Sequence, residues 1–341
     1  MQTRVIVDAM GGDNAPFEIL RGVSAAMEQT DASFILVGSA HEIERLSKLL
    51  RLDMTRVEVI PAPAVVELSD DPIVAYSQKK DSSMMTGLRL LAEGQGDVFV
   101  SAGNTGALLT GATFLVKRAK GVKRAAIGTM IPGVKPFLLL DAGANVSVTP
   151  EYLEQFAVMG SVYMRTMYGI EEPAVGLLNN GTEDHKGTPL QIETHARLQA
   201  CPAIRYVGNV EGNQAMLGGC DVLTADGFTG NIFLKSAEGA FRLMLKTLKQ
   251  EYTRSLKNWV SALLFRKSLA GMKQTFDPSE HGGSPILGVS KPVIKAHGSS
   301  DAKAFKSAIR LAIRFAESGA TETIETLLGT EGTTAGAAGK E

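Results

Sequence analysis

Almost every apolar strand that can be read from this sequence is followed by a polar, glycine-rich turn. The run Arg4–Asp8 has the character of a short buried strand and leads into Asp8-Ala-Met-Gly-Gly-Asp-Asn-Ala-Pro16. Gly11 and Gly12 let the backbone turn sharply and leave space for a ligand, and Pro16 suits the first turn of a helix. A strand, a tight turn and a helix N-terminus in this order favour an anion.

The same arrangement recurs along the chain. The further turns occupy residues 101–107, 141–145, 179–187, 208–212, 226–231, 281–285 and 297–300. In an open parallel sheet, the turns at the carboxyl ends of the strands lie along one edge, and ligands bind there. We therefore expect the turns to converge on one cleft that is rich in Gly, Asn and Asp, with a few His and Lys.

Composition narrows the class of protein. A chain of 341 residues can bury a large core, and its formal net charge of −1 gives no general attraction to nucleic acid. Cys201 and Cys220 are the two cysteines, which indicates reduced thiols in a cytosolic protein rather than a disulfide scaffold. We find no signal-peptide pattern and no run approaching the roughly 20 apolar residues that span a bilayer. We expect a protein that is soluble or bound only to a membrane surface.

Short apolar runs alternate with helical patterns. The predicted strands are Arg4–Asp8, Ser33–Gly38, Val57–Ala62, Asp97–Ser101, Ala125–Ile131, Phe137–Asp141, Ala174–Leu178, Ile204–Gly208 and Asp221–Ala225. The predicted helices include Pro16–Met27, Glu42–Leu50, Met84–Ala92, Pro150–Met167, Pro189–Gln199 and Asn231–Gln250. This alternation predicts an α/β fold, a three-layer α/β/α sandwich around a mostly parallel, Rossmann-like sheet. We expect one domain over residues 1–328 and a disordered Gly/Thr/Ala-rich tail over 329–341.

Residues 252–276 differ from the rest of the chain. They hold five basic residues, no acidic residue and the only tryptophan. Two short helices with a break near Phe265–Lys267 explain the apolar pattern better than one straight helix, which predicts a protruding amphipathic helical hairpin. The hairpin packs on the core or a dimer partner, or it touches anionic lipid. The residues that would meet lipid share one helical face: Leu256, Trp259, Val260, Leu263 and Leu264.

Several familiar motifs are missing from the sequence. There is no Gly-x-Gly-x-x-Gly after the first strand and no Gly-x-x-x-x-Gly-Lys-Ser/Thr, so a nucleotide site has no direct support. There is also no Gly-x-Ser-x-Gly elbow and no zinc-ligand pattern. We therefore expect no cofactor and no metal, and we favour direct displacement between bound substrates over covalent catalysis.

Taken together, the ordered set of turns between residues 8 and 300 resembles the phosphate acyltransferase family (PlsX). The resemblance implies transfer of a fatty acyl group from acyl-ACP to inorganic phosphate, giving acyl phosphate for phospholipid synthesis. It also implies a cytoplasmic homodimer that associates peripherally with the inner face of the cell membrane. Phosphate is already a nucleophile, and a thiol with a pKa near 8–9 leaves without a strong acid. The protein must hold both substrates, screen charge and stabilise an oxyanion.

The resemblance favours Lys186 and Asn231 as the catalytic residues, in contact with phosphate and carbonyl. A solvated lysine and a helix N-cap are the corresponding structural roles. The remaining candidates for substrate binding lie in the same turns, either as ligand contacts or as residues that shape them. They are Asp8, Gly11, Gly12, Asp13, Asn104, Asn145, Asn179, Glu183, Asp226, His281, Gly282, Gly283 and His297.

Two other functions stay open at this point. A decarboxylating 2-hydroxy-acid dehydrogenase has a similar alternation of strands and helices, but it needs clustered arginines for substrate carboxylates, and the polar turns contain none. A non-catalytic membrane scaffold would use only residues 252–276 and would leave the polar turns without a role.

Overall fold

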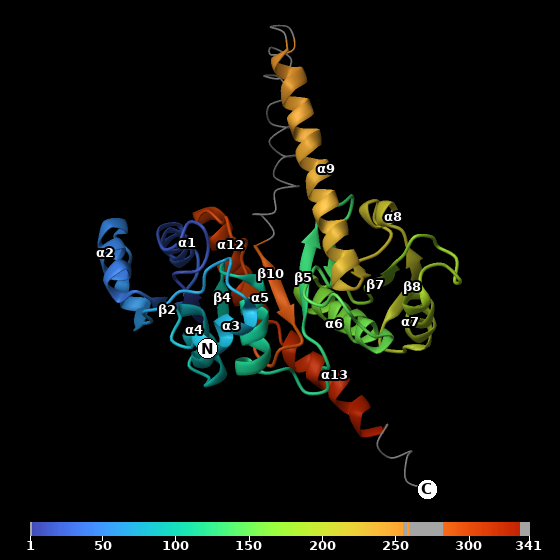
Figure 1. The fold of residues 1–341 in the computed structure, drawn as a ribbon, viewed down its shortest axis with the longest axis horizontal. Helices are drawn as coiled ribbons and strands as arrows, with labels where there is room; N and C mark the ends of the chain where they lie inside the picture. The colour runs from blue at the N-terminus through green and yellow to red at the C-terminus, as the bar shows by residue number, and fades with distance from the viewer. Residues whose placement is uncertain (1, 255–257, 259–281, 335–341) are drawn as a thin grey trace.

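The computed structural model describes residues 2–254, 258 and 282–334. These residues form one mixed sheet with helices on both faces, which confirms the predicted α/β sandwich (Figure 1). The strand order is β3-β2-β1-β4-β11-β10-β5-β6-β9-β7-β8. Among the described strands, β10 runs antiparallel to both of its neighbours, β5 and β6 are also antiparallel, and the other pairs are parallel.

The strands are short and mostly buried. Their bounds are β1 Arg4–Asp8, β2 Ser33–Gly38, β3 Val57–Pro61, β4 Val98–Ser101, β5 Ala126–Ile131, β6 Phe137–Leu140, β7 Ala174–Leu178, β8 Arg205–Val210, β9 Val222–Thr224, β10 Ser284–Leu287 and β11 Val293–Lys295. Side chains alternate across the sheet, so Val5 and Val7 pack on one face while Ile6 packs on the other.

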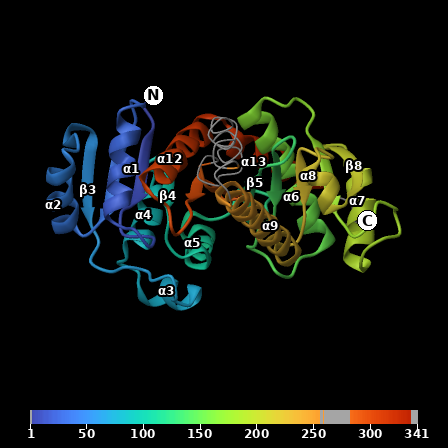
Figure 2. The ribbon, with the colours of Figure 1, turned by 90° about the horizontal axis from the view of Figure 1, so that it is seen from above.

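The helices divide between the two faces of the sheet. Their bounds are α1 Phe17–Met27, α2 Ala40–Leu50, α3 Pro72–Gln78, α4 Ser83–Ala92, α5 Thr105–Gly111, α6 Pro150–Tyr168, α7 Pro189–Ala200, α8 Gly212–Met216, α9 Gly227–Thr253, α12 Ala302–Glu317 and α13 Ala320–Thr334, with short turns η1 Met54–Arg56 and η2 Ala112–Val116. One core contains residues of α1, α2, α6 and α12, and the other contains residues of α4, α5 and α8. Seen from above, α9 lies near the middle of the molecule, between α5 and α8 (Figure 2).

The sequence predicted most of these elements. The strands β1, β2 and β7 have the predicted bounds, whereas β10 and β11 were not predicted. The helix α13 reaches Thr334, so residues 329–334 are helical where we expected an irregular tail. Tertiary contacts hold α13 as far as Gly329, because Glu325 accepts a hydrogen bond from the Lys120 amide and a Cβ atom on Gly329 would lie 3.6 Å from Cγ of Lys120. Residues 335–341 lie outside the described part.

The segment 252–276 is described only at its start. The helix α9 ends at Thr253, and it stands out from the body of the molecule (Figure 1). Leu256, Trp259, Val260, Leu263 and Leu264, which we predicted to contact a membrane, lie outside the described residues, as does His281. Within the described residues, no helix is long and apolar enough to cross a membrane.

Candidate active site

The turns after β1, β4 and β11 interlock because these three strands are neighbours in the sheet. Ser101 donates a hydrogen bond through Oγ to Oδ2 of Asp8, at 2.7 Å. The Asp13 amide donates to the Gly298 carbonyl at 2.9 Å, and the Ala296 amide donates to the Ser101 carbonyl at 2.9 Å. The expected convergence is therefore present in this half of the sheet.

Gly11 and Gly12 are needed for this close packing. A Cβ atom on Gly11 would lie 2.4 Å from Oδ2 of Asp8, and one on Gly12 would lie 2.9 Å from Cβ of Ala102. Gly12 also has φ of +105°, which strains any other residue. The two glycines therefore hold the first turn against the turn after β4.

A second cluster forms where β6 meets the start of α9. The Asp141 carboxylate accepts hydrogen bonds from the amides of Gly143, Ala144 and Asn145. Asp226 caps α9, accepting from the Phe228 and Thr229 amides at 3.0 and 2.8 Å. Because the helix begins at Gly227, Asn231 is not the N-cap that we considered for it, and its side chain is free of that role.

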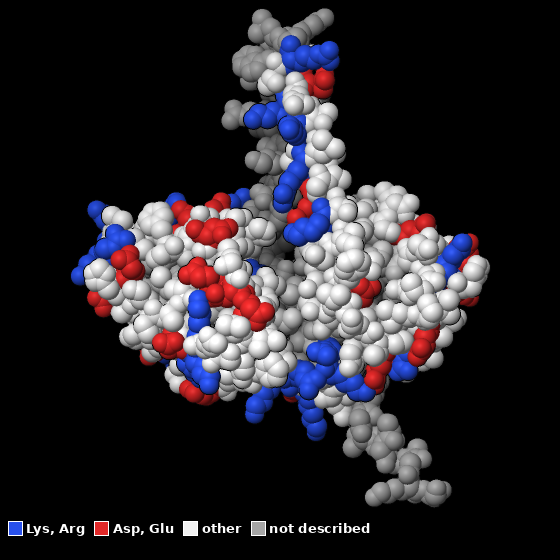
Figure 3. All heavy atoms as spheres, viewed as in Figure 1, with Lys and Arg blue, Asp and Glu red and all other residues white. Residues whose placement is uncertain are grey.

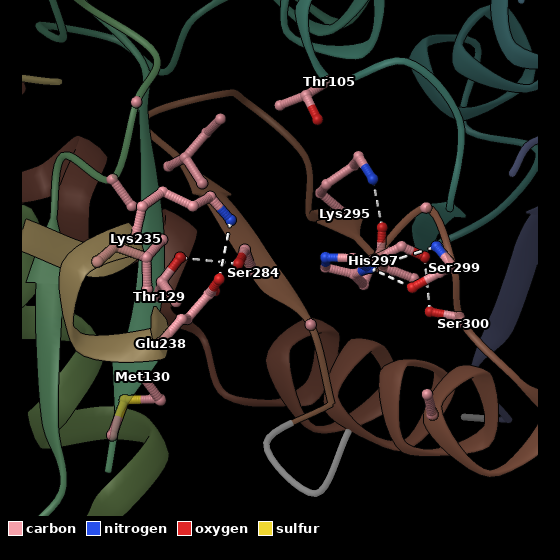
Figure 4. Close-up of a pocket in the computed structure, with 18 of the residues that line it drawn as sticks. Thr105, Thr129, Met130, Lys235, Glu238, Ser284, Lys295, His297, Ser299 and Ser300 are labelled. Carbon is pink, nitrogen blue, oxygen red and sulfur yellow. Dashed lines mark hydrogen bonds and ion pairs between the residues drawn. The ribbon is translucent and has the colours of Figure 1, made fainter. Parts of the chain in front are cut away.

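A polar cavity of about 640 Å³ lies between the two clusters. It opens between β11 and α12 on one side and β5 and α9 on the other, near the middle of the sheet (Figure 4). The lining side chains that could bind or polarise a substrate include Thr129, Asn231, Lys235, Arg242, Lys295 and His297. Three of its lining residues are basic, and the acidic ones are Glu238 and Asp301, so the cavity suits an anion.

Lys295 is the most unusual of these groups. Its side chain is buried, with 9% of the residue exposed, and Nζ donates to the carbonyls of Ala102 and Ala296. Among the described residues, no carboxylate lies within ion-pair distance of it. Burial lowers the pKa of Lys295 to about 8, although the charges of Asp8 and Asp13 act in the opposite sense. A buried ammonium without a close counter-ion is a ready partner for an anionic ligand.

His297 stands beside Lys295 and points its ring into the cavity (Figure 4). Its Nδ1 accepts a hydrogen bond from the Ser299 amide at 3.2 Å, so the proton of the neutral ring lies on Nε2. Partial burial, and then the charges of Lys295 and Lys235, lower the pKa of His297. The ring is therefore neutral near pH 7 and offers an N–H donor to a ligand.

The opposite wall carries its charges on α9. Lys235 and Arg242 are exposed and pair with the Glu238 carboxylate at 3.1 and 3.5 Å. Exposed pairs of this kind are weak and can rearrange around a ligand. Figure 3 shows basic side chains along the side of α9 that faces the hollow.

Lys186 lies elsewhere in the described structure. It is half-buried in the loop after β7 and is not among the residues that line the polar cavity. Asn179 donates to the Lys186 carbonyl at 3.1 Å, and Asn209 donates to the Glu183 carbonyl at 2.9 Å, so the loop has its own support. The catalytic role of Lys186 remains a prediction.

The other predicted site residues have several different positions and roles in the described structure. Asn231, Gly283 and His297 line the cavity, whereas Asp8, Gly11, Gly12 and Asp13 support the turn beneath Lys295. Asn104 and Asn145 use their amide hydrogens on backbone carbonyls and, for Asn145, on Asp141. Asp226 caps α9, and Gly282 packs on the Ser307 carbonyl. Asn179 and Glu183 lie with Lys186 in the loop after β7.

Sequence reasoning missed Lys295, Lys235 and Arg242. The available signal for Lys295 was a single lysine in the apolar run Pro292-Val-Ile-Lys-Ala296, just before the turn at His297. Burial raises the pKa of Cys220 to about 12, with a smaller contribution from Asp221, so this thiol is a poor nucleophile near pH 7.

Comparison with known proteins identifies the family. The model of a family described as "Fatty acid synthesis protein" matches residues 3–323. A phosphate acyltransferase of Acetivibrio thermocellus is 43% identical over 322 residues, covering 94% of this chain and 95% of that protein. One from Brevibacillus brevis is 42% identical over 325 residues, covering 94% and 96%. The chain belongs to the phosphate acyltransferase family.

This membership makes the protein an acyltransferase, and the solved structures agree with its fold. A phosphotransacetylase from Streptococcus pyogenes superimposes with a TM-score of 0.65 at 17% identity, covering 92% of this phosphate acyltransferase and 94% of that chain. EutD phosphotransacetylase from Staphylococcus aureus gives 0.58 at 17% identity, with the same coverage. At this identity the likeness concerns the fold alone.

Proposed function

We propose that this phosphate acyltransferase moves a fatty acyl group from acyl-ACP to inorganic phosphate by direct displacement, giving acyl phosphate for phospholipid synthesis. The observation that carries the proposal is Lys295, a buried cation that opens on a polar cavity and has only carbonyl oxygens as close described partners. A small anion such as phosphate supplies the charge that this site lacks.

The reaction needs no covalent enzyme intermediate. A phosphate oxygen attacks the thioester carbonyl carbon, a C–O bond forms, and the C–S bond breaks with its electron pair going to sulfur. The enzyme's contribution is positioning and electrostatic stabilisation. Lys295 would hold the phosphate, and the Asn231 amide would donate to the carbonyl oxygen as it gains charge. The Nε2–H of His297 would donate to the phosphate or to the departing sulfur.

The test is a coupled assay for thiol release from acyl-ACP, with mass spectrometry of the acyl phosphate. We expect release that depends on phosphate and continues in EDTA. Thiol release without phosphate, or activity that EDTA abolishes and Mg²⁺ restores, would contradict the proposal. Reduction of a nicotinamide cofactor by a 2-hydroxy acid would favour the dehydrogenase alternative.

We also propose that the enzyme is a homodimer that works at the inner face of the cell membrane. The support for the membrane part comes from the sequence of residues 252–276, which holds five basic residues among apolar ones and no acidic residue. Each basic residue near an anionic surface contributes about 1 kcal/mol. Leu263→Glu should release the protein from anionic vesicles while acyl-phosphate synthesis in solution persists. Vesicle binding that survives in a normally melting variant would argue against this part.

A further inference from the structure

A second cavity lies beside the polar one and has a different lining. It measures about 710 Å³, is partly open to solvent, and is bordered by α9, the end of β5 and α8. Its walls are made mainly of Met130, Ile131, Met216, Phe233, Phe241 and Leu245. Of the polar lining residues, Asn213, Ser236 and Arg242 are exposed to solvent, whereas Thr129 and Glu238 are half-buried and also line the polar cavity. The rest of the lining is mainly apolar.

The two cavities are neighbours and share part of their walls. Thr129 and Met130 of β5 and Leu234, Glu238 and Arg242 of α9 line both of them. Lys295, His297 and Asn231 line only the polar cavity. A ligand that passes from one cavity to the other would have a charged or polar end and a long apolar end.

We propose that the apolar cavity, which we call the acyl chamber, holds the hydrocarbon chain of the acyl donor. The proposal rests on the proposed function, because the thioester carbonyl would then lie in the polar cavity near Asn231. A polar ligand is a poor fit to the chamber, since its hydrogen-bonding groups would lose water and find no partner among the apolar side chains. A fatty chain gains from the same surroundings, by about 0.8 kcal/mol for each buried methylene.

The shape of the chamber favours an extended chain. Phe233, Ala237, Phe241 and Leu245 are spaced four residues apart on α9 and line one side of it. Along a helix, the distance from residue 233 to residue 245 is about 18 Å. At the inner end, the Phe233 ring packs 6.3 Å from Phe137, and a Cβ atom on Gly212 would lie 2.9 Å from Cε2 of Phe233. Gly212 therefore lets Phe233 close the chamber at that end.

Ala237 is the position at which to test the chamber. It is half-buried and small, and it lies between Phe233 and Phe241 on the lining face. Ala237→Leu and Ala237→Phe would fill part of the space, and leucine suits a helix almost as well as alanine. Gly239→Leu is the matched control, because Gly239 is exposed on the same helix, lines neither cavity, and has open space where a side chain would start.

The measurement is kcat/KM with acyl donors of four, eight, twelve and sixteen carbons at saturating phosphate. We expect Ala237→Phe to lower kcat/KM at least tenfold for the sixteen-carbon donor and less than twofold for the four-carbon donor. Ala237→Leu should give the same trend with a smaller loss, and Gly239→Leu should behave like the parent protein. An equal loss for every chain length, or no loss, would overturn the acyl chamber.

Two controls separate chain binding from catalysis and from assembly. Displacement of cis-parinaric acid by hexadecanoic acid measures chain binding without the reaction, and we expect it to weaken at least fivefold in Ala237→Phe. Binding that is intact in a parent protein without transfer activity would refute the proposed function but not the chamber. Sedimentation of the same variants tests a second copy of this chain as the occupant. Dissociation of an oligomer by Ala237→Phe, with chain binding unchanged, would overturn the chamber.

Discussion

The polar cavity has one wall made of strand ends and another made of a helix, and the two walls hold their charges differently. Lys295 is buried at the end of β11, where turns from β1 and β4 interlock around it. Lys235 and Arg242 are exposed on α9 and are paired only through Glu238 among the contacts described. A group fixed by the backbone suits a ligand of constant shape, such as phosphate. Long exposed side chains can adapt to a bulky and variable donor.

Among the substitutions that we propose, the largest loss of activity should come from replacing Lys295 in the wall made of strand ends. Lys295→Met should lower kcat/KM for phosphate by about 10³-fold, roughly 4 kcal/mol of transition-state stabilisation. The free energy of unfolding should stay the same or rise, because the change removes a buried charge that lacks a close described counter-ion. Steady-state kinetics and thermal melts test both statements. Near-normal kinetics in this variant would contradict the view that the strand wall binds phosphate through Lys295.

Asn231→Ala should have the next largest effect. We expect kcat to fall by about 10²-fold, because the amide would no longer meet the developing oxyanion. The melting temperature should change little, since Asp226 and not Asn231 caps α9. A variant that loses stability while keeping kcat would make Asn231 a structural residue.

Lys186 provides a comparison with Lys295, since the described structure places it in a separate loop. Lys186→Ala should lower kcat or raise the apparent KM for phosphate by about tenfold, a loss of roughly 1.4 kcal/mol. The exposed Lys249 of α9 lines neither cavity, so Lys249→Ala serves as the control. If the Lys186 variant is impaired more than Lys295→Met, the main phosphate contact belongs to the loop after β7. If the Lys186 variant has the same kinetics as the Lys249 control, the catalytic role predicted for Lys186 is wrong.

Activity and stability should respond to pH in opposite directions. Lys295 has a pKa lowered to about 8, so its charge is lost above that pH, and phosphate affinity should fall by about tenfold one pH unit higher. The unfolded chain keeps the lysine protonated up to its ordinary pKa of 10.5. It therefore binds more protons than the folded protein between pH 8 and 10.5, and the free energy of unfolding should rise across this interval. Denaturant unfolding of the parent beside Lys295→Met isolates this contribution, which the variant should lack.

The smallest effect on activity should come from Asn104. Its side chain caps α5 at the Ala107 amide and donates to the carbonyls of Glu67, Leu68 and Asp70. Asn104→Ala should therefore cost about 1–2 kcal/mol of stability, with kcat/KM unchanged within about twofold. Loss of phosphate affinity in a stable variant would restore Asn104 as a ligand contact.

The sequence predicted the parts of the fold that have a strong local pattern. The strands β1, β2 and β7 are continuous apolar runs, and their bounds were correct. β10 and β11 are four and three residues long and contain Pro285 and Lys295, so neither has the pattern of a buried strand. The start of α9 was placed too late because Gly227 and Gly230 look like turn residues.

From the sequence, we could predict only those site residues that lie in or beside a glycine-rich turn. His297, Gly283 and Asn231 lie in glycine-rich turns or beside them, and they line the cavity. Gly230 does not end a helix, because its missing side chain allows close packing on the Asp141 carbonyl, where a Cβ atom would lie 2.0 Å from the oxygen. Lys295 could be recognised as a site residue only from the order of strands in the sheet, which places β11, a late segment of the chain, beside β4. The burial of Lys295 depends on pairing between strands that are far apart in the sequence, and a local sequence pattern does not predict such pairing.

The position of β10 and β11 has a consequence for how the protein is made. Both strands come from residues 284–295, yet they join β4 to β5 in the middle of the sheet. During synthesis, β1 to β4 and β5 to β9 emerge first and wait with β4 and β5 as open edges. Only a chain that already includes residues 284–295 can close the gap and bring Lys295 to the cavity. We therefore expect a chain that lacks residues 284–295 to be inactive, because β4 and β5 would stay unpaired on one side and Lys295 would be missing from the cavity.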